Sequence, residues 1–236
     1  MTARVSHLAL DGSRFEIQAD LDLGKSFTSV VDVDVDGHRY EFTAGGVGLG
    51  DEVVAALGLP GFGEELAFAG GTLRIARGAV TDPRTGQADA ATVAAWSGAR
   101  HSLVTSLYNV STAEVLGVFS TLRISEGPDG IAIAPAPDAA GTMLGRALVL
   151  KEVPGLGLLE ISGRTRDAVR ELPAWAGLAL SSGELFRDTL SNGSAYLVLA
   201  TPAAVVTVLP LQGTAADAVP EMLDSLAVSV RPAPPW

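Results

Sequence analysis

The sequence predicts an α+β fold that is mainly antiparallel β-sheet, with short covering helices and two packed halves. Apolar and polar residues alternate with a period of two in most segments, as strands with one buried face require. Turn signals built from Gly, Pro and Asp separate these segments at short intervals. The chain lacks the strand–helix–strand rhythm that a parallel doubly wound sheet needs.

The N-terminal quarter is expected to form strands followed by a short helix. In the segment RFEIQADLDL, apolar residues alternate with polar ones, so one face is buried and the other faces water. Asp51 is expected to cap a helix that Gly58 ends, with Val53, Val54 and Leu57 on its buried face. The strands expected here are residues 4–10, 14–23, 27–36 and 38–42.

The middle of the chain is predicted to contain both strands and helix. Residues 65–80 form one or two strands that break at Gly70-Gly71, and residues 123–135 form a hairpin around Pro128-Asp129-Gly130. Residues 88–96 are rich in alanine and are expected to form a short helix. Residues 100–110 form a strand, whereas residues 112–122 fit a strand or a helix equally well.

The C-terminal part is expected to contain two hairpins, two helices and a last strand. Residues 166–177 are predicted to form a short helix that Pro173 stops. In the segment 214–226, Val219, Met222, Leu223 and Leu226 have the spacing of one buried helical face. Thr214 would cap this helix, unless the helix begins only at Pro220. The strands expected here are residues 146–153, 156–165, 195–201, 204–211 and 227–232.

Residues 134–142 (APAPDAAGT) have almost no large side chain and are the best candidate for a linker. They divide the chain into a β-rich half, residues 1–137, and an α+β half, residues 142–236. The segments FSTLRISEGPDGIAIAP and LDSLAVSVRPAPP share a pattern: an apolar segment, a serine shortly before a leucine, an alternating strand and a proline. Two related halves would produce this echo, and so would chance in a chain of this composition.

Composition and charge limit the functional classes. Of the 236 residues 47% are hydrophobic and 18% charged, which is enough apolar material for a real core. The net charge of −11 makes nucleic acid and anionic membrane surfaces poor partners. The absence of cysteine excludes disulfides, thiolate nucleophiles and iron–sulfur clusters. The chain shows no signal-peptide core and no run of membrane-spanning length, so a soluble cytoplasmic protein is expected.

Three aspartates in the stretch SVVDVDVDGHRYEF raise the question of a calcium site. Asp32, Asp34 and Asp36, followed by a glycine, match the first half of a calcium-binding loop, but position 12 is Thr43 where that loop needs glutamate. Alternating valines instead favour a hairpin with Asp36-Gly37 as a type I′ turn. In that hairpin Asp34 faces Arg39 and Asp32 faces Glu41, and the like-charged pair leaves a weak surface cation site as the alternative.

Cofactor and nucleotide motifs are incomplete or missing, so no cofactor is expected. The glycine-rich stretch AGGVGLGDEVV joins a strand to a helix, but Asp51 stands where a dinucleotide-binding turn needs its third glycine. A carboxylate there would compete with a bound pyrophosphate for the helix N-terminus. The complete phosphate-binding motif G-x-x-x-x-G-K-[ST] does not occur.

Catalytic constellations are equally weak. The three histidines, at positions 7, 38 and 101, have no metal-ligand spacing, and neither G-x-S-x-G nor S-x-x-K occurs. The best dispersed catalytic pair would be His101 with Asp82 or Asp89. Paired carboxylates would come from Asp51, Glu52, Glu64 and Glu65, but aromatic content is only 6%, and Trp96 and Trp175 are expected to be core residues on short helices.

Two functional hypotheses follow, and catalysis is the less favoured. The first is a non-catalytic binding or assembly protein that contacts a protein partner, or a second copy of itself, through sheet edges and an apolar patch. The second is a small-ligand binder or enzyme whose site is assembled from scattered residues near the glycine-rich region 45–63, acting as a lid. The proline-rich tail 231–236 could also dock in a partner's groove, although a frayed terminus is the preferred interpretation.

Overall fold

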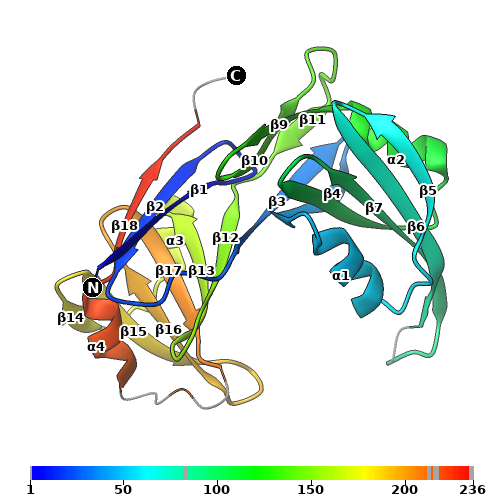
Figure 1. Ribbon diagram of the computed structural model, residues 1–236. Helices are drawn as coiled ribbons and strands as arrows, with labels where there is room; N and C mark the ends of the chain where they lie inside the picture. Colours follow the sequence, from blue (N-terminus) through cyan, green and yellow to red (C-terminus); the bar gives the residue numbers. More distant parts are fainter. Residues whose placement is uncertain (1, 82–83, 212–213, 215–217, 234–236) are drawn as a thin grey trace. The chain divides into compact units, whose positions relative to one another are not determined.

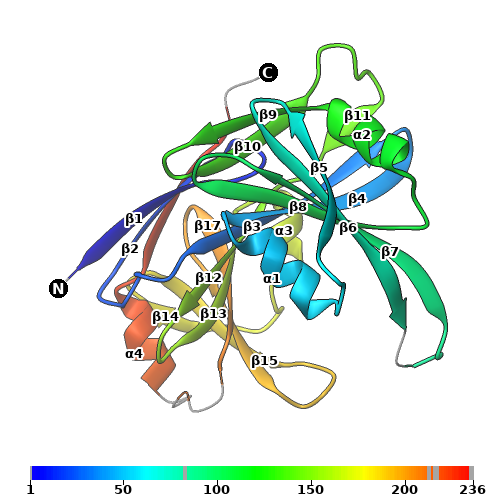
Figure 2. The same ribbon diagram turned by 45° about the vertical axis from the view of Figure 1, so that its right-hand side comes forward.

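The computed structural model describes residues 2–81, 84–211, 214 and 218–233. Antiparallel strands dominate it, and four short helices occur among the described residues, as Figures 1 and 2 show. This confirms the predicted α+β class. No described helix has the length and apolar character needed to cross a membrane.

The chain forms two compact units, each with its own core. Unit 1 contains residues up to 7, 13–27 and 148–233, and unit 2 contains residues 8–12 and 28–147. The chain passes between the units after residues 7, 12 and 27, and again between Ala147 and Leu148, just after the segment 134–142. Residues 13–27 group with the C-terminal residues because they contribute a strand that pairs with the last strand of the chain.

Unit 2 is built on one sheet with a helix on each face. Along the sheet the strands are ordered β3 (Phe27–Val35), β4 (His38–Gly46), β8 (His101–Tyr108), β7 (Ala88–Ser97), β6 (Gly71–Thr81) and β5 (Phe62–Phe68). The short strand β11 (Thr142–Leu144) pairs with β3, and β9 (Leu122–Gly127) forms an antiparallel hairpin with β10 (Gly130–Pro135).

The helices of unit 2 are α1 (Leu49–Ala56) and α2 (Thr112–Ser120), which lie on opposite sides of this sheet (Figures 1 and 2). Val54 of α1 packs with Val93 and neighbours on one face, whereas Phe119 of α2 packs with Trp96 and neighbours on the other. The short covering helices of unit 2 therefore lie on both faces of its sheet.

Unit 1 repeats this topology. Its sheet has the order β12 (Leu148–Val153), β13 (Gly157–Gly163), β17 (Ala204–Leu209), β16 (Ala195–Ala200), β15 (Gly183–Thr189) and β14 (Leu178–Leu180). The strand β18 (Ala227–Arg231) pairs with β2 (Arg14–Ala19), which lies beside β1 (Ala3–Leu8). The helices are α3 (Arg166–Arg170) and α4 (Val219–Asp224).

Each element of the unit 2 sheet therefore has a counterpart in unit 1, in the same chain order and the same place in the sheet. Helices α1 and α3 each follow the second strand, and α2 and α4 each follow the sixth. The echo seen in the sequence falls on corresponding elements, because FSTLRIS ends α2 and begins β9 while LDSLAVS ends α4 and begins β18.

The helix predicted over residues 88–96 is wrong, because these residues form the inner strand β7. Its residues pair with β6 on one side and β8 on the other, and Ala91 to Trp96 are all buried. A strand that is buried on both faces loses the polar alternation that marks a half-buried strand. Its alanines then resemble a helix, and pairing outweighs their helix propensity.

The other helix predictions are corrected mainly at their boundaries. Helix α1 begins at Leu49 after Gly48, so Asp51 lies in its first turn rather than at its N-cap. Residues 112–120 are helical, and Ser111 and Glu114 form a capping box that resolves the strand-or-helix alternative. Helix α4 begins at Val219 with Pro220 in its first turn, while residues 215–217 lie outside the described residues.

Candidate functional site

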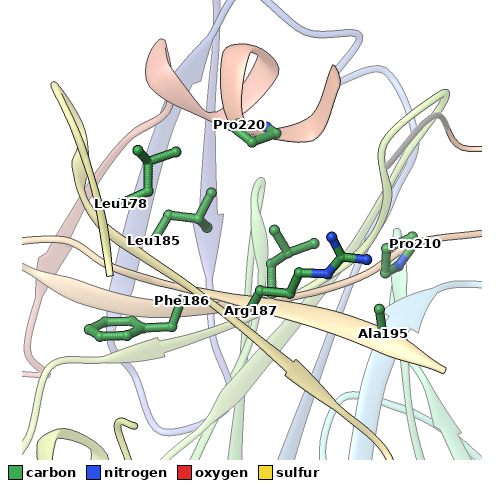
Figure 3. A pocket seen from close by; sticks show the side chains of 8 residues that line it. Leu178, Leu185, Phe186, Arg187, Ala195, Pro210 and Pro220 are labelled. Carbon is green, nitrogen blue, oxygen red and sulfur yellow. The ribbon is translucent and has the colours of Figure 1, made fainter. Parts of the chain in front are cut away.

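An apolar cavity of about 260 Å³ lies in unit 1, between one face of the β14–β16 hairpins and helix α4. Figure 3 shows Leu178 and Leu185 pointing toward Pro220 of α4, and the guanidinium of Arg187 extending toward Pro210. The residues that line the cavity are Leu178, Leu185, Phe186, Arg187, Ala195, Leu197, Pro210 and Pro220.

Strand register places the lining residues on one face. Leu185 and Arg187 are two positions apart in β15 and so point to the same side of the sheet. Arg187 lies directly opposite Leu197 of β16, and Thr189 lies opposite Ala195. The ring of Phe186 instead belongs to the apolar cluster on the other face, where α3 packs. Because side chains alternate along β15, Phe186 packs on the face that contacts α3, and Arg187 points to the face that bears the cavity.

Arg187 is the charged residue of this cavity. It is exposed, and the structure gives its guanidinium no hydrogen bond and no ion pair with any described residue. The other lining residues are Leu, Ala, Pro and Phe, so they offer no side-chain acceptor. The cavity therefore combines apolar walls with one guanidinium that is free to bind an anion or to stack on an aromatic ring.

Exposed leucines extend the apolar surface beyond the cavity. Leu178, at its rim, is 55% exposed. Leu190 and Leu211, which are 41% and 48% exposed, directly follow Thr189 of β15 and the lining residue Pro210. Exposed large apolar side chains near an apolar cavity are typical of a surface that another molecule covers.

The three aspartates of the possible calcium loop form the hairpin that the sequence predicts. The register pairs Asp34 with Arg39 and Asp32 with Glu41, as expected. Asp36 and Gly37 have positive φ values of 51° and 83°, as a type I′ turn requires. Asp34 Oδ1 accepts the Gly37 N–H at 2.8 Å, and an Asp32 oxygen lies 3.7 Å from Arg39.

The described residues hold no group of three or more His, Asp or Glu side chains that could bind a metal ion. The carboxylates considered for sugar chemistry contact arginines instead. Asp51 receives two hydrogen bonds from Arg74, and Glu64 pairs with Arg77. These contacts fasten α1 and β5 to β6. Residues 45–63, considered as a lid, include helix α1, whose Val54 is buried.

His101 has a carboxylate partner, but it is neither of the two considered. Asp82 lies outside the described residues, and no hydrogen bond joins Asp89 to His101. Nδ1 of His101 is 3.2 Å from Glu126 Oε1. The structure shows no hydroxyl hydrogen-bonded to its ring among the described residues, so this pair lacks a nucleophile.

Burial of the Glu126 carboxylate by itself raises its pKa. Hydrogen bonds from the N–H groups of Ala99, Arg100 and His101 and from the His101 ring outweigh this effect, so the pKa of Glu126 is lowered from its ordinary value. Both side chains are mostly buried, and the carboxylate closes the turn between β7 and β8. The geometry is that of a structural capping contact.

The remaining candidate residues are distributed through the fold. His7 is buried and stacks on Phe27 with ring centres 4.8 Å apart, and His38 is an exposed residue of the β3–β4 hairpin. Trp96 is a core residue, as predicted, but on a strand. Trp175 is 53% exposed, so the prediction that it is a core residue on a helix is wrong. The last three residues of the proline-rich tail lie outside the described residues.

Lys151 is a buried cation that was not among the candidates. Its Nζ donates hydrogen bonds to the carbonyl oxygens of Leu23, at 2.8 Å, and Lys25, and it lies 4.5 Å from the centre of the Phe27 ring. Burial lowers the pKa of its ammonium group. The visible signal was a lysine at an inward position of the alternating segment 148–153. Its contacts fasten residues 23–27 to β12.

Arg187 was also missed, because the sequence around it carries no clear signal. Its neighbours in GELFRDT do not form a regular alternation, so the sequence does not show that it shares a face with Leu185. Comparison with known proteins adds no functional information: no family model, no curated protein and no solved structure matches this chain.

Proposed function

We propose that this protein is a non-catalytic binding protein that assembles with a protein partner through the apolar cavity of unit 1. The observation that carries the proposal is the cavity itself, with exposed leucines around it and a single unpaired guanidinium in its lining. Buried apolar anchors in well-formed pockets supply most of the binding energy of protein interfaces.

The size of the cavity favours a protein partner over a complete small ligand. Pockets that enclose small molecules usually measure about 300–1,000 Å³, whereas this one measures about 260 Å³. A space of this size accepts one or two side chains of a partner. The exposed Leu190 and Leu211 beside it would then be covered by the rest of the partner's surface.

Native mass spectrometry of the protein isolated gently from its own cells tests the proposal. The expected result is a mass above the 24.1 kDa of the chain that includes a second polypeptide. In the variant Ala195→Phe, the new ring occupies the cavity and the partner should be lost. The matched control Ala67→Phe places the same side chain at an exposed strand position of unit 2 and should retain it.

Two results would contradict the proposal. One is a bare chain, and the other is a complex that survives Ala195→Phe unchanged. A mass in whole-chain multiples that Ala195→Phe abolishes would identify the partner as a second copy of this chain. A bound adduct of a few hundred daltons in place of a polypeptide would instead favour the alternative of a small-ligand binder.

A further inference from the structure

We infer that the partner fills the unit 1 cavity with an aromatic side chain and pairs a neighbouring carboxylate with Arg187. The inference rests on the proposed function and adds the chemistry of the partner. Its evidence comes from the repeated topology, because unit 2 shows which side chains fill the corresponding face of its sheet.

The hairpins β5–β6 and β14–β15 align residue by residue. Each has a two-residue turn, closed by the pair Phe68–Gly71 in unit 2 and by the pair Leu180–Gly183 in unit 1. Counting from these turns, Leu73 corresponds to Leu185. The next strands follow the same register, since Leu73 lies opposite Trp96 and Leu185 lies opposite Leu199.

The corresponding face of unit 2 is filled with aromatic rings. Phe68 and Phe119 meet edge to face with ring centres 6.1 Å apart, and the indole N–H of Trp96 donates to the Phe68 carbonyl oxygen at 2.9 Å. All three rings pack in the same apolar cluster.

Unit 1 has leucine at each of these three places. Leu180 and Leu199 follow from the hairpin alignment. Leu223 corresponds to Phe119 because each lies two residues before the C-cap of its helix. Three leucines occupy less volume than two phenylalanines and a tryptophan, and in a close-packed interior such a deficit leaves space nearby. The three leucines do not line the cavity themselves, but each lies two or three positions from a lining residue of its own element, namely Leu178, Leu197 and Pro220. The cavity thus lies on the face that unit 2 fills with rings.

Arg187 adds the charge requirement. By the same alignment it corresponds to Ile75 of unit 2, which is 1% exposed in the core. Unit 1 therefore has a guanidinium where its counterpart has a buried aliphatic side chain. The structure gives Arg187 no ion pair among the described residues. A guanidinium beside an apolar space binds a carboxylate through two parallel hydrogen bonds and can stack on a ring.

A matched pair of small probes tests this chemistry on the full chain. The anion 3-phenylpropanoate carries an aromatic ring and a carboxylate, and 3-phenylpropanamide is its neutral counterpart. Amide NMR signals of Leu185 and Leu197 should shift on titration with the anion. We expect the neutral amide to bind about fivefold more weakly, as loss of a partly exposed ion pair implies.

The variant Arg187→Gln should remove the difference between the two probes while leaving ring-dependent binding in place. Arg187 is exposed, so this variant should fold, which its amide spectrum verifies. The matched control Arg166→Gln changes another exposed arginine of unit 1, on helix α3, and should leave the fivefold difference unchanged.

The outcomes separate the inference from the proposed function. Equal affinities for the two probes, an Arg187→Gln variant that still discriminates between them, or no shifts at Leu185 and Leu197 would overturn the inference. Any of these results combined with a partner that Ala195→Phe displaces would leave the proposed function intact. Selective binding of the anion with no partner polypeptide would overturn the proposed function and assign the cavity to a small aromatic carboxylate.

Discussion

Glu126 offers a quantitative test of how unit 2 is held together. Its carboxylate accepts hydrogen bonds from the N–H groups of Ala99, Arg100 and His101, each at 2.8 Å. Glu126 belongs to strand β9, so this strand holds the turn between β7 and β8. The substitution Glu126→Gln keeps the shape of the side chain but removes its charge. The single oxygen of the glutamine amide can still accept hydrogen bonds, whereas the NH₂ group that replaces the second carboxylate oxygen cannot.

The magnitude follows from these bonds. A hydrogen bond to a charged group contributes about 1.5–3 kcal/mol, and one between neutral groups contributes about 0.5–1.5 kcal/mol. Three bonds lose their charge assistance in Glu126→Gln, and the partial exposure of the site allows water to replace some of the loss. We expect unit 2 to be destabilised by about 2 kcal/mol at neutral pH.

The pH dependence has a defined sign. The pKa of Glu126 is lower in the folded protein than its ordinary value of 4.5. The carboxylate therefore stabilises the fold at pH values above 4.5, and this contribution is lost as the pH falls through the lowered folded-state pKa. The gap in stability between wild type and Glu126→Gln should be constant from about pH 6 to 8 and should shrink in acid.

Urea unfolding followed by tryptophan fluorescence measures the effect, because buried Trp96 reports on unit 2. The control Glu65→Gln neutralises an exposed glutamate of the same unit and should change stability by less than about 0.5 kcal/mol. The reasoning is refuted if Glu126→Gln is as stable as this control, or if its deficit grows as the pH is lowered.

Three further substitutions test other parts of the fold. Gly37→Ala should cost about 1 kcal/mol in urea unfolding, because φ at this turn residue is +83°, and a cost near zero would contradict the type I′ assignment. Lys151→Met should lower stability by about 2 kcal/mol or more, because the buried carbonyl of Leu23 and the partly buried carbonyl of Lys25 lose their donor. An unchanged thermal midpoint would disprove this. Gly71→Ala should destabilise the β5–β6 hairpin strongly, because a Cβ there would lie 2.4 Å from a backbone carbonyl oxygen, and a well-tolerated variant would contradict that packing.

Local chemistry explains why so many hairpins could be predicted. The turn at Asp36-Gly37 and the hairpin around Pro128-Asp129-Gly130 depend on residues that favour the required backbone angles by themselves. The pairs that these turns impose then follow by counting along the strands. Asp34 opposite Arg39 is one such pair, and the structure confirms it.

Partners distant in sequence explain the errors. Residues 88–96 have alanines that favour a helix, and only pairing with two neighbouring strands makes them extended. For residues 112–120 the signal was local, since the Ser111–Glu114 capping box is readable in the sequence. The β-branched and aromatic residues of the same segment fit a strand equally well, so the capping box did not decide between helix and strand.

The site could not be predicted because it depends on a difference between two units. Arg187 becomes informative only when Ile75 is known to occupy the corresponding place. That alignment needs the strand pairing of both units, since the sequence echo covers only the ends of α2 and α4 and the strands that follow. Catalytic motifs can be recognised from the spacing of residues along the chain. This cavity can be recognised only when the side chains of unit 1 are compared with the larger ones at corresponding positions of unit 2.

The two units differ in how completely they close the same face, and this has a consequence for stability. Unit 2 fills the face with Phe68, Trp96 and Phe119, so its core is complete without a partner. Unit 1 leaves a cavity of about 260 Å³ there, and its apolar lining stays in contact with water until a partner covers it. A partner that enters this cavity binds only folded unit 1, so binding adds to the stability of unit 1 by mass action, by about 2.7 kcal/mol at a hundredfold excess over Kd. Binding of a partner in the cavity is therefore coupled to the folding of unit 1.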